Sequence, residues 1–474
     1  MNTTPISDLP QNLYYGGGGA TFVTPLGIAI LVVAALLIFL VPRKYVIWPL
    51  LAGALLVPLS VEVVVFGLHL QSYRLTLLAG CLRMAWDVLV KRDFYPRRMT
   101  SLDKVFIAWA VVSTVTFCIL WGEWAAVVNK IGFLYTTLAA YVIVRHLIRN
   151  KADVLRAIKV MAVVLAIIAP LMLREHITGS NPFSLAGANP ETERRNGEDR
   201  ADGPFSHPII AGTVGAMTLP LFVGLWWQRN RLLAATGVIA STMMVVASVS
   251  ATPVMTYLAA VGALMLWPAR RYLRFFRWGL VAGIIGLQLV MKSPVWFVLS
   301  HIGNLTGGTG WHRAYLIDNF VRHFWEWWLI GTRNNSQWGY FMWDSINTYV
   351  NAGVEGGLIT FILFIAIFVY AYKRAGAARK MAEGSGSRRD ALLIWAIGAC
   401  IFANTVAFFG ISYFDQSMLL WYCVLAMASV TTKFVADPKR SQVQLQVADA
   451  SAEMPAPDPV LAGSQTMTSL LRQA

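Results

Sequence analysis

Long apolar runs, separated by short polar segments, recur along most of the chain. A run of about 18 to 25 apolar residues can cross the roughly 30 Å hydrocarbon core of a bilayer as a helix, because a helix satisfies its own backbone hydrogen bonds there. The third of these runs contains Arg74, Arg83 and Asp87 and also fits an interfacial or protein-buried helix. The predicted fold is all-α, a polytopic integral membrane protein. About 12–13 transmembrane helices are expected, at residues 24–41, 47–66, 72–90, 103–121, 130–148, 153–173, 208–227, 232–249, 253–267, 277–299, 347–371, 391–409 and 414–432.

The composition agrees with this class, since 57% of the 474 residues are hydrophobic and only 13% are charged. All four cysteines fall inside apolar runs, so neither a disulfide framework nor a metal cluster is expected. The polar, proline-containing segment 433–474 predicts a disordered cytoplasmic tail. No basic segment or cleavage site precedes the first run, so we predict that it is a retained span preceded by an extracytoplasmic segment, 1–23.

Lysine and arginine alternate between the loops of the membrane domain, 24–432. The loops after the odd-numbered spans are basic, as in PRKY, KRDFYPRR, RHLIRNKADVLR, QRNR, ARRYLRFFR and the segment that ends in SRR. Short cytoplasmic loops retain such charges, so these loops are predicted to be cytoplasmic. The formal net charge of +15 then reflects topology and contact with anionic lipid. We therefore expect the lipid bilayer, and no nucleic acid, as a partner.

Two long loops on the outer side, at about residues 174–207 and 300–346, depart from the charge rule. Their arginines are Arg174, Arg194, Arg195, Arg200, Arg313, Arg322 and Arg333. Cations retained on the translocated side suggest a local function, although long loops cross regardless of charge. The alternative is a solvated surface, in which nearby acids neutralise the arginines. These acids are Glu191, Glu193, Glu198 and Asp199.

Aromatic residues in the second loop predict a helix that lies at the membrane interface. They are Trp311, Tyr315, Phe320, Phe324, Trp327 and Trp328. Such a helix anchors the loop, and it also suits the wall of a site, because aromatic faces stack on sugar rings.

Polar residues recur on one face of the helix that follows this loop. Asp344, Asn347 and Asn351 are three and four residues apart, and Glu355 continues the stripe. Polar groups in a span face a protein interior or a wet cavity. The stripe therefore indicates either a site or hydrogen bonds between helices.

These segments together resemble the O-antigen ligase and O-antigen polymerase superfamily, bacterial membrane glycosyltransferases that act on undecaprenyl-diphosphate-linked glycans. The matching motifs are RADGPFSHP with Arg200, Gly203, Phe205 and Pro208, GTGWHRAYLID with Gly310 and Arg313, and NTYVNAGVEGGL with Asn347, Tyr349, Glu355 and Gly357. Ligases of the family usually carry a histidine where this chain has Ile346, and the turn SVSATPV lacks an arginine that they often have. Ile346 favours chain polymerisation, or assembly of capsule or exopolysaccharide, over ligation to a lipid A core.

The resemblance implies transfer of a glycan from the lipid diphosphate to an acceptor hydroxyl on the periplasmic side of the bacterial inner membrane. Other polysaccharide-assembly membrane proteins are expected as partners. Guanidinium forks meet phosphate oxygens with paired hydrogen bonds. The expected diphosphate ligands are Arg200 and Arg313, followed by Arg333 and Arg174. Arginines can hold the departing diphosphate, so neither a metal nor a cofactor is expected.

The acceptor hydroxyl needs a group that orients it and takes its proton. Asp344 is the first candidate, and Asn347 and Glu355 share its helix face. The expected contacts of the acceptor or donor loop are His207, His312 and Trp311.

Two other functions fit many spans with polar residues. One is a transporter or flippase of polysaccharide or lipid-linked glycans, for which symmetric halves and paired discontinuous helices are typical; the sequence indicates neither. The other is a non-catalytic partner in an envelope assembly, in which substitution of Arg200 would leave the polysaccharide intact.

The predicted topology can be tested with cysteine probes in whole cells. Probes at Ser180 and Asn335 should react with a membrane-impermeant reagent added outside, whereas a probe at Gly384 should react only after the cytoplasm is opened. Labelling of Gly384 from the periplasm would overturn the arrangement.

Overall fold

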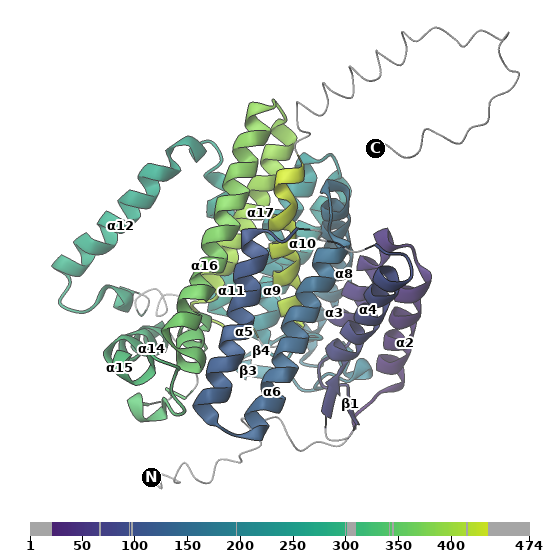
Figure 1. Ribbon diagram of the computed structural model, residues 1–474, viewed down its shortest axis with the longest axis horizontal. Coiled ribbons are helices and arrows are strands. Elements are labelled where there is room, and N and C mark those ends of the chain that lie inside the picture. The colour runs from purple at the N-terminus through teal and green to yellow at the C-terminus, as the bar shows by residue number, and fades with distance from the viewer. Residues whose placement is uncertain are drawn as a thin grey trace, which may run out of the picture. The chain divides into compact units, whose positions relative to one another are not determined.

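The computed structural model describes residues 21–65, 68–93, 95, 98–195, 197–298, 300, 310–340, 342–343, 346–413 and 416–434. Most of these residues are helical, and within them two short antiparallel hairpins pair β1 (Glu62–Val65) with β2 (Leu68–Gln71) and β3 (Glu193–Arg195) with β4 (Glu198–Arg200). In the same residues, seven helical segments are long and apolar enough to cross a membrane, and four shorter apolar helices accompany them. The chain therefore has the build of a multi-pass membrane protein (Figure 1).

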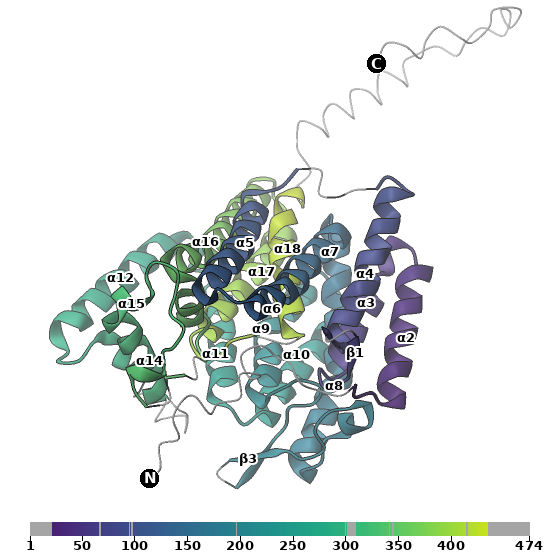
Figure 2. The same cartoon turned by 60° about the horizontal axis from the view of Figure 1, so that its bottom comes forward.

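Most of the predicted spans coincide with a helix within a few residues. The helices are α2 (Pro25–Leu40), α3 (Ile47–Leu56), α4 (Ser72–Leu89), α5 (Ser101–Trp121), α6 (Trp124–Leu134), α7 (Ala140–Leu147), α8 (Lys151–Thr178), α9 (Pro208–Trp227), α10 (Arg231–Ala247), α11 (Ala251–Met265), α12 (Leu273–Val290), α14 (Gly310–Arg322), α15 (Phe324–Trp327), α16 (Thr348–Gly384), α17 (Arg388–Ala407) and α18 (Ser417–Val430). A π-helical turn, Tyr135–Ala139, joins α6 to α7. No residue of α12 is buried, and this helix lies apart from the other helices in Figure 1 and is drawn close to α14 and α15 in Figure 2.

The span predicted over 47–66 is wrong. α3 ends at Leu56 because Pro58 disfavours a helical conformation at Val57, which is extended, and has no N–H to continue the helix. The valine-rich run that follows forms the β1–β2 hairpin instead, as β-branched side chains favour.

The loops gather in two sets at opposite ends of the helices. The loops that the sequence marks as basic contact one another through the pairs Arg43 with the Leu147 carbonyl, Arg149 with Asp93, Lys151 with Asp390, Gln228 with the Arg389 carbonyl and Arg270 with Glu383. The other loops contact one another through the pairs Ser60 with the Gly187 carbonyl, Arg200 with Ser250, Arg313 with Thr252, Gln416 with the Pro204 carbonyl and Arg333 with the Trp121 carbonyl. The basic loops and the other loops, which alternate along the sequence, thus lie at opposite ends of the helices.

α9 is the central helix of this arrangement and packs against α10, α11 and α17. Small residues let its neighbours approach, because a Cβ on Gly212 would lie 2.3 Å from Ser248 Oγ and one on Gly215 would lie 2.8 Å from the Ser241 carbonyl oxygen. Its first turn begins at Pro208, directly after the RADGPFSH segment. Packing of α9 therefore fixes the position of that segment relative to the turn between α10 and α11.

α16 is broken at Gly357, where φ is 75° and ψ is −174°. The backbone groups freed by the break pair with the chain after α15: Leu358 N–H donates to the Trp328 carbonyl and Thr332 N–H donates to the Val354 carbonyl, both at 2.8 Å. The glycines of the VEGG motif thus have a structural function, since they let the segment 328–332 enter the helix.

Gly357→Ala should destabilise the protein, because the ψ and positive φ at this position are nearly restricted to glycine and such strain costs of order 1–3 kcal/mol. The new Cβ would also lie 2.6 Å from the Leu329 carbonyl oxygen. Gly376→Ala, in the same helix with no atom within 4 Å of the new Cβ, is the control. Thermal unfolding in detergent should show a lower midpoint for Gly357→Ala only; equal midpoints would contradict the constraint.

Candidate functional site

The N-terminal end of α11 contacts both of the arginines that the sequence selects. Arg200 donates from Nη2 to Ser250 Oγ, and Arg313 donates from Nη2 to Thr252 Oγ1, each at 2.7 Å. Ser250 and Thr252 are two residues apart, so residues from two distant loops meet at one place. We call Arg195, Arg200, Arg313, Ser250 and Thr252 the arginine site.

The β3–β4 hairpin delivers Arg200 and Arg195 to this place. Glu193 pairs with Arg200 and Arg195 pairs with Glu198 in the register, whereas Arg194 lies opposite Asp199. Because side chains alternate across a strand, the first two pairs share one face and the third lies on the other. Gly197, with φ at 86°, makes the sharp connection possible.

Burial makes the arginine site electrostatically unusual. Arg200 is 2% exposed, and the Nε–H groups of both Arg200 and Arg313 are buried with no hydrogen-bond partner in the part of the chain that the structure describes. Burial lowers the pKa of both guanidiniums, and the positive charge of Arg195 lowers both further. Buried cations with unpaired donors favour an anionic ligand, since each added charge-assisted hydrogen bond offsets the cost of burial.

The carboxylate of Glu193 borders the site. It forms an ion pair with Arg200 Nη1, and its other oxygen lies 3.6 Å from His207 Nε2. His207 is the N-cap of α9, where its Nδ1 accepts from the Ile209 N–H at 3.1 Å. One of the predicted loop histidines thus lies beside Arg200.

The other predicted loop contacts lie on α14, the helix that carries Arg313. His312 is buried, and Trp311 is 46% exposed with its ring 6.3 Å from that of Tyr315. The aromatic residues of this region divide into two groups, because Phe320 and Trp327 stack within a core against α16 while Trp311 and Trp328 face outward. The aromatic helix is thus anchored to protein on one side and leaves an aromatic surface on the other.

Two further arginines of the predicted diphosphate set lie elsewhere. Arg333 donates to the carbonyls of Leu120 and Trp121, at 2.7 and 3.0 Å, and so caps the C-terminal end of α5. Arg174 is exposed near the end of α8. The structure brings together Arg200 and Arg313 and leaves these two outside the arginine site.

The candidates on α16 have structural partners. Asn347 is 1% exposed and caps the helix, because its Oδ1 accepts from the N–H groups of Tyr349 and Val350. Glu355 pairs with the buried Lys130 of α6 at 2.8 Å. Asp344 lies outside the described residues. Neither described candidate contacts the arginine site directly.

The third motif, NTYVNAGVEGGL, holds in place the loop that lies against Arg313. Thr348 N–H and Oγ1 donate to the Phe408 and Ile411 carbonyls, which holds the loop between α17 and α18. In this loop the Gly410 carbonyl accepts from Thr252 Oγ1, and a Cβ on Gly410 would lie 3.2 Å from Arg313 Cζ. Two of the three motifs named in the sequence thus contribute an arginine to the arginine site, and the third holds the loop that packs against Arg313.

Sequence reasoning missed the pairing of Glu175 with Asp202. Glu175, at the end of α8, accepts from the N–H groups of Asp202 and Gly203 at 3.0 and 2.9 Å. Burial, together with the Glu175 charge, raises the pKa of Asp202 to about 8. The two carboxyl groups therefore share a proton and hold the RADGP segment onto α8.

Sequence reasoning also missed Arg195 and Glu193 as site residues, although Asn196-Gly197 is a hairpin signal that places them on the face of Arg200.

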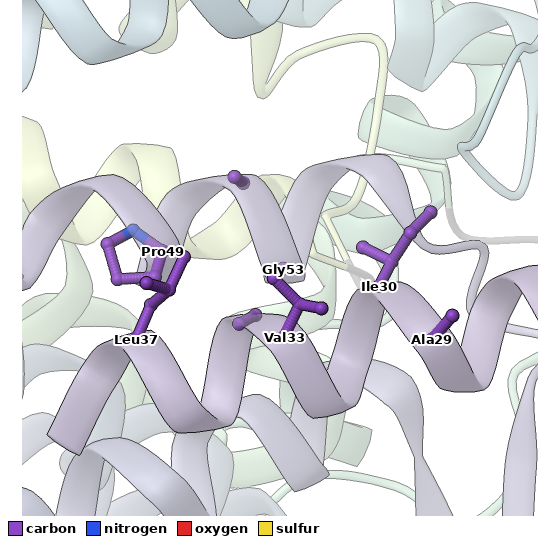
Figure 3. A pocket seen from close by; sticks show the side chains of 8 residues that line it. Ala29, Ile30, Val33, Leu37, Pro49 and Gly53 are labelled. Carbon is purple, nitrogen blue, oxygen red and sulfur yellow. The ribbon is translucent and has the colours of Figure 1, made fainter. Parts of the chain in front are cut away.

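The apolar groove between α2 and α3 is a different kind of feature (Figure 3). Ala29, Val33, Leu37 and Pro49 are among its apolar lining residues, so it suits a hydrocarbon chain and offers no ligand to a phosphate. Among the described residues no group of three or more His, Cys, Asp or Glu side chains could hold a metal ion.

Comparison with known proteins leaves the site to be judged on its own geometry. A scan against models of known protein families finds no match to the chain, and a search of curated proteins finds none either.

Asp202→Asn should remove a pH dependence of stability. A folded pKa of about 8 means that the folded chain keeps a proton that the unfolded chain loses near pH 4, so stability is full below about pH 4 and declines until about pH 8. The asparagine amide can still donate to Glu175. Unfolding midpoints measured from about pH 5 to about pH 8.5 should fall less for Asp202→Asn than for the wild type. The exposed Glu198→Gln is the control, and a steeper decline in Asp202→Asn would contradict a shared proton.

Proposed function

We propose that the chain is a membrane glycosyltransferase of the O-antigen ligase and polymerase type. It transfers a glycan from an undecaprenyl-diphosphate carrier to an acceptor hydroxyl during assembly of a cell-surface polysaccharide, such as O antigen, capsule or exopolysaccharide. The observation that carries the proposal is the meeting of Arg200 and Arg313 at Ser250 and Thr252.

The leaving group explains why such a site is useful. When the bond between the glycan and the diphosphate breaks, negative charge develops on a phosphate oxygen. Arg200 and Arg313 are held in place before the reaction, and each keeps a buried Nε–H without a partner among the described residues. Preorganised donors aimed at developing charge stabilise a transition state without reorganisation. The positive charge that stabilises the leaving diphosphate therefore comes from the arginines of the chain itself.

The distribution of the loops supports a periplasmic reaction. We assign the basic set to the cytoplasm by the positive-inside rule, which puts the arginine site on the periplasmic side of the bacterial inner membrane. In this arrangement the shorter helices α2, α10, α11 and α18 cross with the longer ones, and the loops at about 174–207 and 300–346 are periplasmic. A carrier lipid in the outer leaflet then presents its diphosphate at the level of the site.

Polymerisation is the favoured reaction. The position before Asn347 is Ile346, which can neither bind nor deprotonate an acceptor. An acceptor that is itself a growing lipid-linked chain suits a site open to the periplasm.

A transporter or flippase is the second candidate, because α16 is discontinuous and transporters build substrate sites at such breaks. Here, however, the freed backbone groups of Val354 and Leu358 pair with the segment 328–332. The break serves packing, which favours the transferase over the transporter.

Arg200→Lys and Arg313→Lys should each lower glycan transfer by about 10²-fold to 10³-fold, because lysine keeps the charge and loses the planar fork. The measurement is transfer from undecaprenyl-diphosphate-linked glycan in proteoliposomes, beside glycan length in cells. Arg194→Lys is the control, since Arg194 pairs with Asp199 on the opposite face of the hairpin. Normal glycan made by well-expressed Arg200→Ala and Arg313→Ala proteins would refute the proposal, and movement of the lipid-linked glycan without transfer would favour a flippase.

A further inference from the structure

Glu193 is an acid that reaches both the arginine site and bulk water. One carboxylate oxygen pairs with Arg200 Nη1 and the other faces His207 Nε2 at 3.6 Å. The side chain remains 48% exposed, so an acceptor can approach it. Asn347 and Glu355, by contrast, do not contact the arginine site: Asn347 caps α16 and Glu355 pairs with Lys130.

The hydrogen bonds of His207 fix which nitrogen holds its proton. Nδ1 accepts from the Ile209 N–H, so Nδ1 is unprotonated. A neutral imidazole then has its proton on Nε2, the nitrogen that faces Glu193. His207 therefore presents an N–H to the Glu193 carboxylate at 3.6 Å, and the carboxylate is the group of this pair that can accept a proton.

We propose that Glu193 is the general base of the transfer reaction and that His207 is the residue that positions it, an inference that rests on the proposed function. The acceptor hydroxyl gives its proton to Glu193 as its oxygen bonds to C1 of the donor glycan. The bond from C1 to the diphosphate oxygen breaks, and its electron pair leaves with the lipid diphosphate, which Arg200 and Arg313 hold. Glu193, now a neutral acid, returns the proton to water.

The ion pair with Arg200 gives the reaction an order. Arg200 Nη1 donates to Glu193, and a phosphate oxygen competes for the same donor. When the donor binds, its phosphate takes the place of Glu193 as the anion that pairs with Arg200. The Glu193 carboxylate is then free to turn toward the acceptor. Glu193 is thus held by Arg200 while the donor is absent and is freed as a base when the leaving group is in place.

Glu193→Gln tests this assignment in the full-length protein in proteoliposomes, with undecaprenyl-diphosphate-linked glycan as donor. Turnover should fall by about 10²-fold to 10⁴-fold, the usual effect of removing a general base. The KM for the donor should not rise, because the competing carboxylate is gone, and the acidic limb of the pH–rate profile should disappear. Glu191→Gln, an exposed acid that precedes the same hairpin, should behave as the wild type. Wild-type turnover with an intact acidic limb in Glu193→Gln would overturn the proposal.

Two further variants keep the test decisive if the amide disturbs folding. Glu193→Asp preserves the charge but draws the carboxylate back by one methylene, so it should fold, keep the acidic limb and turn over more slowly; full turnover would count against a base. His207→Asn keeps the helix cap, since asparagine is a preferred N-cap, but removes the donor to Glu193. It should lower turnover and shift the acidic limb without changing the donor KM, and an unchanged profile would overturn the positioning role.

Failure of this inference differs from failure of the proposed function. If the wild type transfers glycan and Arg200→Lys is impaired while Glu193→Gln is normal, only the assignment of the base is wrong. If the wild type transfers nothing from the diphosphate donor, both are wrong.

Discussion

The contact of the buried Arg200 and the half-buried Arg313 with the hydroxyl groups of Ser250 and Thr252 is the interaction on which the candidate site depends. Moving a cation out of water costs several kcal/mol, and Ser250 and Thr252 offer Arg200 and Arg313 only neutral partners. Arg195 adds a further positive charge beside them. The ion pair with Glu193 offsets the charge of Arg200 and not that of Arg313. The arrangement is therefore poor for stability and well suited to an anion that meets both guanidiniums.

The rest of the fold holds this arrangement in place. The close packing of α9 on α10 sets the distance from RADGPFSH to the turn between α10 and α11, because Gly212 and Gly215 allow direct contact. The Asn347 cap and the Thr348 hydrogen bonds fix the loop whose Gly410 lies against Arg313. The break at Gly357 is part of the same support, since it lets the chain after α14 and α15 pack into α16.

Apolar length and charge alternation are read residue by residue and predicted most of the helices, whereas Arg200 and Arg313 were selected from the loop arginines by the resemblance of their motifs. The α3 prediction failed where Pro58 outweighed an apolar run. The functions of Asn347, Glu355 and Arg333 could not be read from spacing, since a polar residue on a helix face looks the same whether it caps a helix, pairs with Lys130 or binds a substrate. The position of Glu193 needed the hairpin register, a tertiary fact that only Asn196-Gly197 signals.

The most direct test of the account is a cryo-electron microscopy map of the full-length protein in nanodiscs with undecaprenyl diphosphate. Density for the diphosphate is expected within hydrogen-bonding distance, about 2.7–3.2 Å, of the guanidiniums of both Arg200 and Arg313, with the Glu193 carboxylate displaced from Arg200. Diphosphate bound elsewhere, or an arginine site unchanged at saturating ligand, would contradict it.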